Sequence, residues 1–248
     1  MILVFAAMLP EVRACLGGAD LPAPDAVGGF PVYRSGDVAV CQTGLGRRAI
    51  DAASAALAHF EPRAVLSAGV AGGLAPSIAA GDLVLCRQID HESHRTLSVD
   101  ASVLSDKELM DTAFGLASGL GMSPIAGTSI TVDEAAWTPA EKAAHHAWKS
   151  HDIVEMESYW TGEAAVRANV PFLAVRTVSD AADHELQQTG AMRDDGTFDQ
   201  QALINFLQKN PEAGPAIAAT SERSRLAMQN LERFLTALMP FLAATGVT

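Results

Sequence analysis

The sequence predicts an α/β protein built on a mainly parallel sheet with helices on both faces. Short apolar runs of strand length alternate with alanine-rich segments of helix length, which is the pattern of strands joined by crossover helices. Several runs, such as AVLSAGV and FLAVRTV, are almost continuously hydrophobic, as expected of strands that are buried on both faces. With 248 residues, 49% of them hydrophobic and 19% charged, the chain can bury a large core.

The expected elements follow one another without a flexible linker or an internal repeat. In chain order, the strands are MILVFAA, DVAVCQT, AVLSAGV, DLVLCRQI, PIAGTSITV, DIVEM and PFLAVRTVS. Helices are expected at 46–60, 101–120, 139–149 and 157–169. A polar stretch after Asp183 precedes helices near 199–209 and 213–243, which Pro211 and Pro215 separate. We therefore expect residues 1–248 to form a single domain with a helical C-terminal end.

Charge and cysteine content exclude several classes of protein. Seventeen basic and 29 acidic residues give a net charge of −12, which repels phosphate backbones, so no nucleic-acid partner is expected. Cys15, Cys41 and Cys86 have no ligand spacing and predict neither a disulfide framework nor a zinc site. No basic residue precedes the apolar opening MILVFAAML, as one would in a signal peptide. No apolar run reaches the ~18 residues that a membrane-spanning helix needs. We expect a first core strand, no integral membrane segment and a cytoplasmic protein.

Chemistry is expected where the apolar runs end, because ligands of such sheets bind beyond the carboxyl ends of strands. Gly69, Gly72 and Gly73 predict a loop directly after a strand, where a ligand can approach the backbone; a plain turn is the alternative. Asp180 ends another buried strand. It is either a helix cap or a partly buried acid that donates a proton. In IVEMES, Glu155 and Glu157 flank a methionine, and most such pairs are solvated surface residues.

Three other motifs are weaker. TGLGRRA, residues 43–49, matches the dinucleotide fingerprint G-x-G-x-x-A, but 64–70 lacks the acid expected about 20 residues later, so a tight glycine turn is the alternative. His91 and His94 could share a helix face, yet without a third ligand no metal is expected. Trp137 is either a core residue or a stacking platform for a flat ligand. No cofactor is expected.

Five segments, taken together and in order, resemble the nucleoside phosphorylase and nucleosidase superfamily. They are AAMLPEV (6–12), TGLG (43–46), GVAGGLAPSIAAGDLV (69–84), VEMES (154–158) and VRTVSDAAD (175–183). The A-M-x-x-E-V pattern is most similar to 5′-methylthioadenosine/S-adenosylhomocysteine nucleosidases. Residues 194–238 are more similar to the hopanoid-associated phosphorylases, whose proposed substrate is an adenosyl-hopane.

The resemblance implies a fold, an activity and a partner. The fold is a three-layer α/β/α domain around a mixed, partly barrel-like sheet, active as a homo-oligomer. The activity is cleavage of the N-glycosidic bond of a purine (adenine-type) nucleoside, and this small-molecule substrate is the expected partner. The alternatives of another class are a non-catalytic nucleoside-binding module and a dinucleotide-dependent oxidoreductase that uses TGLG.

The resemblance also implies roles for single residues. Asp180 would protonate N7 of the purine, kept protonated by its apolar strand, and Glu11 would activate the water. Glu157 would bind the ribose hydroxyls, and Met156 would pack against the sugar. Glu155 would share a face with Glu157 but could equally be a structural neighbour. The other residues expected to bind substrate are Val70, Ala71, Gly72, Met8, Ser179 and Trp137.

Departures from the family pattern bear on the nucleophile. Val70 stands where the family commonly carries serine, and Ser67 where phosphorolytic bacterial relatives place arginine, so water is favoured over phosphate. Arg13 and Arg47 are the candidates for a differently built phosphate site. Tyr159 and Trp160 replace small residues, either as packing or as a wall around a lipid-linked 5′ group, and packing is favoured.

Overall fold

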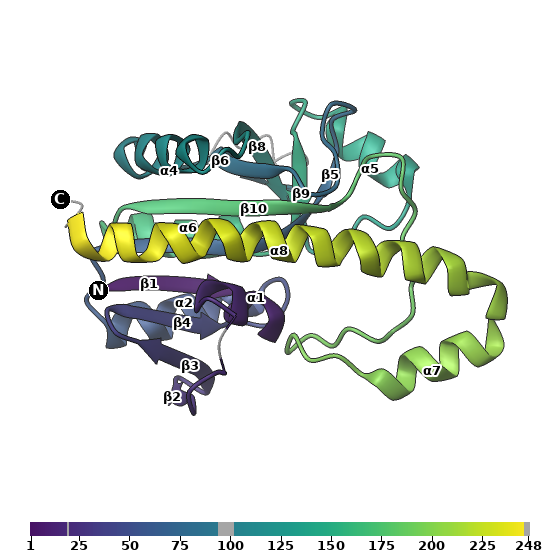
Figure 1. The fold of residues 1–248 in the computed structure, drawn as a ribbon, viewed down its shortest axis with the longest axis horizontal. Coiled ribbons are helices and arrows are strands. Elements are labelled where there is room, and N and C mark those ends of the chain that lie inside the picture. Colours follow the sequence, from purple (N-terminus) through teal and green to yellow (C-terminus); the bar gives the residue numbers. More distant parts are fainter. Residues whose placement is uncertain (19, 94–101, 246–248) are drawn as a thin grey trace.

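A closed ring of strands forms the centre of the protein (Figure 1). The computed structural model describes residues 1–18, 20–93 and 102–245. Five strands close the ring in the order β5, β10, β6, β8, β9 and back to β5: β5 (Ala64–Gly73), β10 (Phe172–Asp180), β6 (Leu83–His91), β8 (Ile125–Thr131) and β9 (Ile153–Glu155). The predicted partly barrel-like sheet is confirmed.

A second group of strands, which we call the wing, extends from the ring through β5. β1 (Ile2–Ala6) pairs in parallel with β5, and the wing continues through β4 (Val38–Gln42), β3 (Phe30–Ser35) and β2 (Asp25–Val27). The short β7 (Val103–Leu104) pairs with β6. Antiparallel pairing of β6 with β10, of β9 with β5 and of β3 with both neighbours makes the sheet mixed, as the family resemblance implied, rather than mainly parallel.

Helices cover both faces of this sheet. On one face lie α2 (Arg48–His59) and α6 (Ser158–Arg167), and on the other α1 (Leu9–Cys15), α4 (Lys107–Gly119) and α8 (Gly214–Thr245). Strand β1 shows the division, because Leu3 and Phe5 enter the first core while Ile2 and Val4 enter the second. This alternation explains the continuous apolar runs and gives three layers.

The remaining helices lie at one end of the molecule. α5 (Pro139–His146) lies at the end of the ring where β5 finishes and β9 begins, and α7 (Gln200–Lys209) stands away from the sheet (Figure 1). The 3-10 turn Pro211–Ala213 separates α7 from α8 at the predicted proline break. None of the described helices combines the length and hydropathy that a bilayer span requires.

The observed elements differ from the prediction in four places. The hairpin β2–β3 and the seven-residue α1 were not predicted, because both are too short to show a periodicity. Helix 101–120 starts only at Lys107, where Asp106 accepts the Leu109 N–H as an N-cap; residue 101 lies outside the described part. The glycines at 69, 72 and 73 lie within β5, so the expected loop is in fact strand.

The long helix α8 shares its core with the sheet. Leu231, Phe234, Leu235 and Leu238 are fully buried in one cluster with residues of β1, β5 and β10. We propose on this ground that residues 1–248 form a single domain. The three cysteines are also buried, and desolvation raises the pKa of Cys41 and Cys86 to about 12, so these thiols behave as apolar filling.

Candidate active site

A cavity of about 170 Å³ opens at the carboxyl ends of β5, β9 and β10. Glu11, Glu157 and Asp180, which are far apart in sequence, all line it. Of the other residues predicted to bind substrate, it is also lined by Met8, Val70, Ala71, Gly72, Glu155, Met156 and Ser179. The structure therefore brings nearly all of the predicted site into one place.

Glu11 is held by the backbone from two sides. In the first turn of α1, its Oε2 accepts the N–H groups of Ala7 and Met8, and its Oε1 accepts the Val70 N–H of β5, each at 2.9 Å. A Cβ at Gly69 would lie only 2.4 Å from Oε1, so a glycine is needed at this point of the strand. Burial raises the pKa of Glu11 above its usual value, although the Val70 N–H and Arg176 oppose the shift.

The two glutamates of IVEMES have different surroundings. Glu157 precedes α6 and its Oε1 accepts the Gly46 N–H of the TGLG turn at 2.9 Å. Desolvation and then the charge of Glu155 raise the pKa of Glu157 to about 8. The TGLG turn thus serves a carboxylate of the site, as well as connecting β4 to α2.

Glu155 is fully engaged within the protein. Its carboxylate accepts from the Thr131 hydroxyl, the N–H groups of Glu157 and Ser158, and the Arg176 guanidinium at 3.0 Å. Against the desolvation of burial, Arg176 and these hydrogen bonds hold the pKa of Glu155 below its usual value. These contacts favour the structural alternative for Glu155, which fixes the start of α6 and thereby Glu157.

Arg176 is a member of the site to which the sequence analysis gave no role. It is 2% exposed, and its Nη2 donates to Ser67 Oγ at 2.8 Å and to Glu155. Its charge acts on Glu11, Glu155 and Glu157. An arginine within the apolar run FLAVRTV was the available signal, since buried charges require partners.

Asp180 has a charged partner that was not predicted. Its Oδ2 lies 2.5 Å from Lys142 Nζ of α5, and its Oδ1 accepts from Ser179 Oγ at 2.6 Å. A Cβ at Gly72 would lie 3.2 Å from Oδ2, so this glycine also admits a carboxylate. The expectation of an apolar environment for Asp180 was wrong, because the lysine reaches it from another element.

Three predicted residues do not line this cavity. Trp137 lines a neighbouring, mainly apolar cavity of about 600 Å³, which shares Met8, Val70 and Leu186 with the first. Arg13 is exposed on α1. Arg47 pairs with Asp133 at 3.8 Å and lies over the Trp160 ring. Among the described residues that line the 170 Å³ cavity there is no lysine or arginine.

Tyr159 and Trp160, the bulky pair after EMES, are 8% exposed and belong to the core of α2 and α6. Both also contact the ring of His91. These contacts support packing over a wall around a 5′ group.

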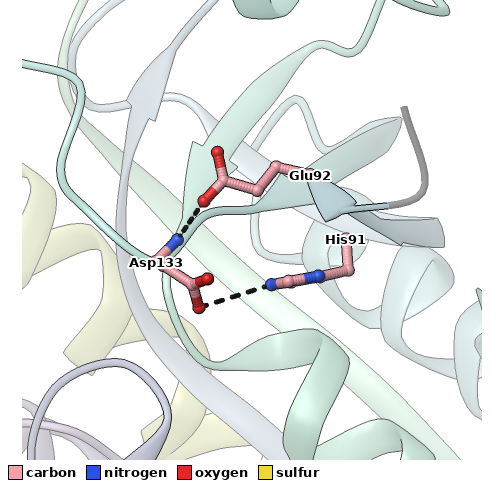
Figure 2. Close-up of side chains that lie close together, drawn as sticks. All are labelled: His91, Glu92 and Asp133. Carbon is pink, nitrogen blue, oxygen red and sulfur yellow. Dashed lines mark hydrogen bonds and ion pairs between the residues drawn. The ribbon is translucent and has the colours of Figure 1, made fainter. Parts of the chain in front are cut away.

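A cluster of His91, Glu92 and Asp133 lies at the ends of β6 and β8 (Figure 2). His91 ends β6 and so does not lie on a helix; His94 is outside the described residues. Glu92 accepts the Asp133 N–H at 2.6 Å, and His91 Nε2 lies 3.5 Å from the Asp133 carboxylate. Their ligand atoms are close enough to share a cation, but Arg47 on the same Asp133 carboxylate would repel one. We assign no metal to this cluster.

Comparisons with known proteins show which proteins this chain is similar to. The chain is 26% identical over 166 residues to the 5′-methylthioadenosine/S-adenosylhomocysteine nucleosidase of Bacillus licheniformis, covering 62% of this chain and 72% of that protein. It is 30% identical over 159 residues to that of Haemophilus influenzae, covering 59% and 69%.

Solved structures share the fold. The Neisseria meningitidis 5′-methylthioadenosine/S-adenosylhomocysteine nucleosidase in complex with methylthio-immucillin-A superposes with a TM-score of 0.75 at 19% identity, covering 97% of this chain and 99% of that one. The futalosine hydrolase of Helicobacter pylori gives 0.72 at 18% identity, covering 97% of each chain.

The family model described as phosphorylase superfamily matches residues 2–209. The resemblance carried by the five segments is confirmed, and the chain belongs to the phosphorylase superfamily.

Proposed function

We propose that this enzyme hydrolyses the N-glycosidic bond of an adenine-type nucleoside and releases the base. The observation that carries the proposal is the meeting of Glu11, Glu157 and Asp180 around one cavity. The curated relatives are named as nucleosidases of 5′-methylthioadenosine and S-adenosylhomocysteine, which supports this type of bond. The futalosine hydrolase among the structural neighbours leaves the substituents of the nucleoside to experiment.

The three carboxyl groups match the needs of the reaction. Glu11 takes a proton from water as the water oxygen bonds to C1′, and a raised pKa suits a base that works near neutrality. Glu157 accepts hydrogen bonds from the ribose hydroxyls and favours the positive charge that develops on the sugar. The C1′–N9 electron pair leaves with the base, which becomes protonated at N7 beside Asp180.

Water is the favoured nucleophile over phosphate. A phosphate needs several donors, yet the Val70 N–H already donates to Glu11, and Ser67 already accepts from Arg176. Arg13 and Arg47 lie elsewhere in the described structure. Phosphorolysis is the alternative and would require Arg176 to exchange partners.

The apolar cavity of about 600 Å³ favours a second, more specific candidate. It adjoins the proposed catalytic cavity and is walled by α8, α7 and the segment after β10, with Trp137, Met192, Phe198 and Met228 among its lining residues. A large apolar 5′ group would fill it. We therefore propose adenosyl-hopane, the substrate suggested by the resemblance of residues 194–238, as the alternative to a small 5′ substituent.

A panel of adenosines with 5′ substituents of increasing apolar length tests reaction and substrate together. We expect adenine and the 5-substituted ribose as products with and without phosphate. If adenosyl-hopane is the substrate, kcat/KM should be highest for the longest apolar group. Met228→Trp, which fills the apolar cavity, should raise KM for long substituents about tenfold or more and leave 5′-methylthioadenosine unaffected. Ribose 1-phosphate as the product would show phosphorolysis instead, and equal use of all substituents would contradict the larger substrate.

The role of Asp180 beside N7 of the leaving base is tested by Asp180→Asn. Asp183→Asn is the matched control, since Asp183 is 87% exposed and close by in sequence. We expect Asp180→Asn to lower kcat roughly 10²- to 10⁴-fold, and the control to keep full activity. Unchanged turnover in Asp180→Asn would refute the role. Ligands that raise the melting temperature without any release of base would favour the non-catalytic binding module.

We further propose a cytoplasmic homo-oligomer. The buried thiols of Cys15, Cys41 and Cys86 support a reducing compartment. Light scattering on the purified chain measures the oligomeric state, and a monomer over the working concentration range would contradict the proposal.

A further inference from the structure

The helix α5 has an unusual burial pattern. Its one buried residue is Lys142, which is 0% exposed, while the alanines on the same helix face outward. A surface helix normally buries apolar residues and exposes its lysines. The sequence of α5 therefore places a charge where packing alone calls for an apolar side chain.

The ammonium group of Lys142 is fully satisfied at the rim of the proposed site. It donates to Asp180 Oδ2 at 2.5 Å, to the Ala181 carbonyl at 2.9 Å and to the His184 carbonyl at 2.8 Å. Three acceptors use all three N–H groups, which only the charged form carries. Thr138 and Glu141 form a capping box that fixes the start of α5 and thereby the position of the lysine.

Stability alone does not account for this pair. Buried ion pairs are often no more stable than apolar residues of similar volume, because both charges lose their hydration. Lys142 also contacts Asp180, which is the carboxyl group that faces the leaving base in the proposed reaction. The contact with Asp180 therefore favours a role of Lys142 in the reaction, exerted through Asp180, over a purely structural role.

We propose that Lys142 is a positioning residue that holds the Asp180 carboxylate in an ion pair and directs it toward the base. This inference rests on the proposed function. As a carboxylate, Asp180 accepts hydrogen bonds, so it suits a base with N–H groups, namely a 6-amino purine. N7 of that base takes up a proton from solvent, and the proton that Glu11 takes from the attacking water returns to solvent, so the step is balanced. A 6-oxo purine would instead present oxygen and nitrogen lone pairs to a negative charge.

The surroundings of the pair contain other titratable groups. They are Glu141, His145 and His146 on α5, Asp183, His184 and Glu185 after β10, and Glu155 at the end of β9. Glu141 accepts N–H groups at the start of its own helix, His146 contacts the His151 carbonyl, and His184 Nδ1 accepts the Ala181 N–H. Asp180 forms its ion pair with the Lys142 ammonium group.

Two neutral variants separate charge from packing. Both replacements are one atom shorter than lysine. Lys142→Met removes the charge and all donors, whereas Lys142→Gln removes the charge and keeps two of the three donors. Lys107→Met is the control, since that lysine is exposed on α4 and pairs with Asp111. Circular dichroism establishes folding, and if Lys142→Met does not fold, Lys142→Gln alone decides.

We expect both variants to move the acid limb of the kcat/KM profile to higher pH by about one unit, because a buried carboxylate that has lost its neighbouring cation is protonated more easily. We also expect the preference for 5′-methylthioadenosine over 5′-methylthioinosine to fall about tenfold. A profile and a preference that Lys142→Gln leaves unchanged would overturn the inference, even if kcat fell. Failure of the wild type to release adenine would instead overturn the proposed function.

Discussion

At the scale of single residues, the proposed reaction uses the ionised carboxylate of Glu157, yet ionisation of this buried group lowers the stability of the folded protein. Its carboxyl group is buried, and its pKa is raised from 4.5 to about 8. Between these values the unfolded chain releases the proton and the folded chain keeps it, so the free energy of unfolding falls as pH rises through this window. Below pH 4.5 both states hold the proton, and above about 8 both have lost it.

Glu157→Gln should therefore stabilise the protein at pH 7.5 and abolish most activity. The amide removes the cost of ionisation and still accepts the Gly46 N–H. Relative to wild type, we expect a gain on the order of a few kcal/mol at pH 7.5 that vanishes near pH 4.5. Urea unfolding at the two pH values measures it. Glu163→Gln, in the helix α6 that follows Glu157, is the control. An equal gain in unfolding free energy there would contradict this explanation.

The sequence predicted the three acidic residues of the site, but it predicted neither the burial of Lys142 nor the partners of Arg176. Glu11, Glu157 and Asp180 stand in motifs whose order is informative. Lys142 lies in a polar helix where any lysine is expected to be solvated, so its burial depends on where α5 packs. Arg176 was visible as a charge in an apolar run, but its partners come from β5 and β9 and could not be assigned.

At the scale of elements, the glycines of β5 serve the site and not a loop. The strand continues to Gly73 because the ring requires pairing with β10 and β9 up to that point. Local sequence predicted a break, since glycine weakens strands. Ring closure is a long-range property, and it overrides this local preference.

Gly69→Ala should reduce activity more than stability. The new Cβ would lie 2.4 Å from Glu11 Oε1, so the carboxylate must move away from its three N–H donors. We expect kcat to fall about 100-fold, with an unfolding free energy lower by about 1–3 kcal/mol. Gly115→Ala in α4 is the control: nothing lies within 4 Å of its added Cβ, so it should gain about 0.5–1 kcal/mol and keep full activity. Normal turnover by Gly69→Ala would show that Glu11 need not be fixed.

At the scale of the whole molecule, α8 packs against both the wing and the ring. It packs on α1, β1, β5 and β10 and lies along the sheet (Figure 1). The sequence predicted its length and its proline boundary well, because both are local. It did not predict which face of the sheet α8 covers, since each strand is apolar on both faces.

Leu235→Ala tests whether residues 1–248 unfold as one unit. Leu235 is 0% exposed between α8 and the sheet, so its truncation should cost about 2–5 kcal/mol. Near-UV and far-UV circular dichroism should show one coincident, lowered transition. Leu226→Ala is the control, since Leu226 is 43% exposed on the same helix and should change little. Two separate transitions would contradict the single domain.

The position of β5 in both parts of the sheet has a consequence for the spacing of the proposed catalytic groups. Glu11 is anchored to this strand through Val70, and Asp180 lies against it at Gly72, two residues further on. A single stretch of backbone therefore sets the spacing between the proposed water-activating group and the group that faces the leaving base. A substitution elsewhere in the sheet can change this spacing only if it displaces β5.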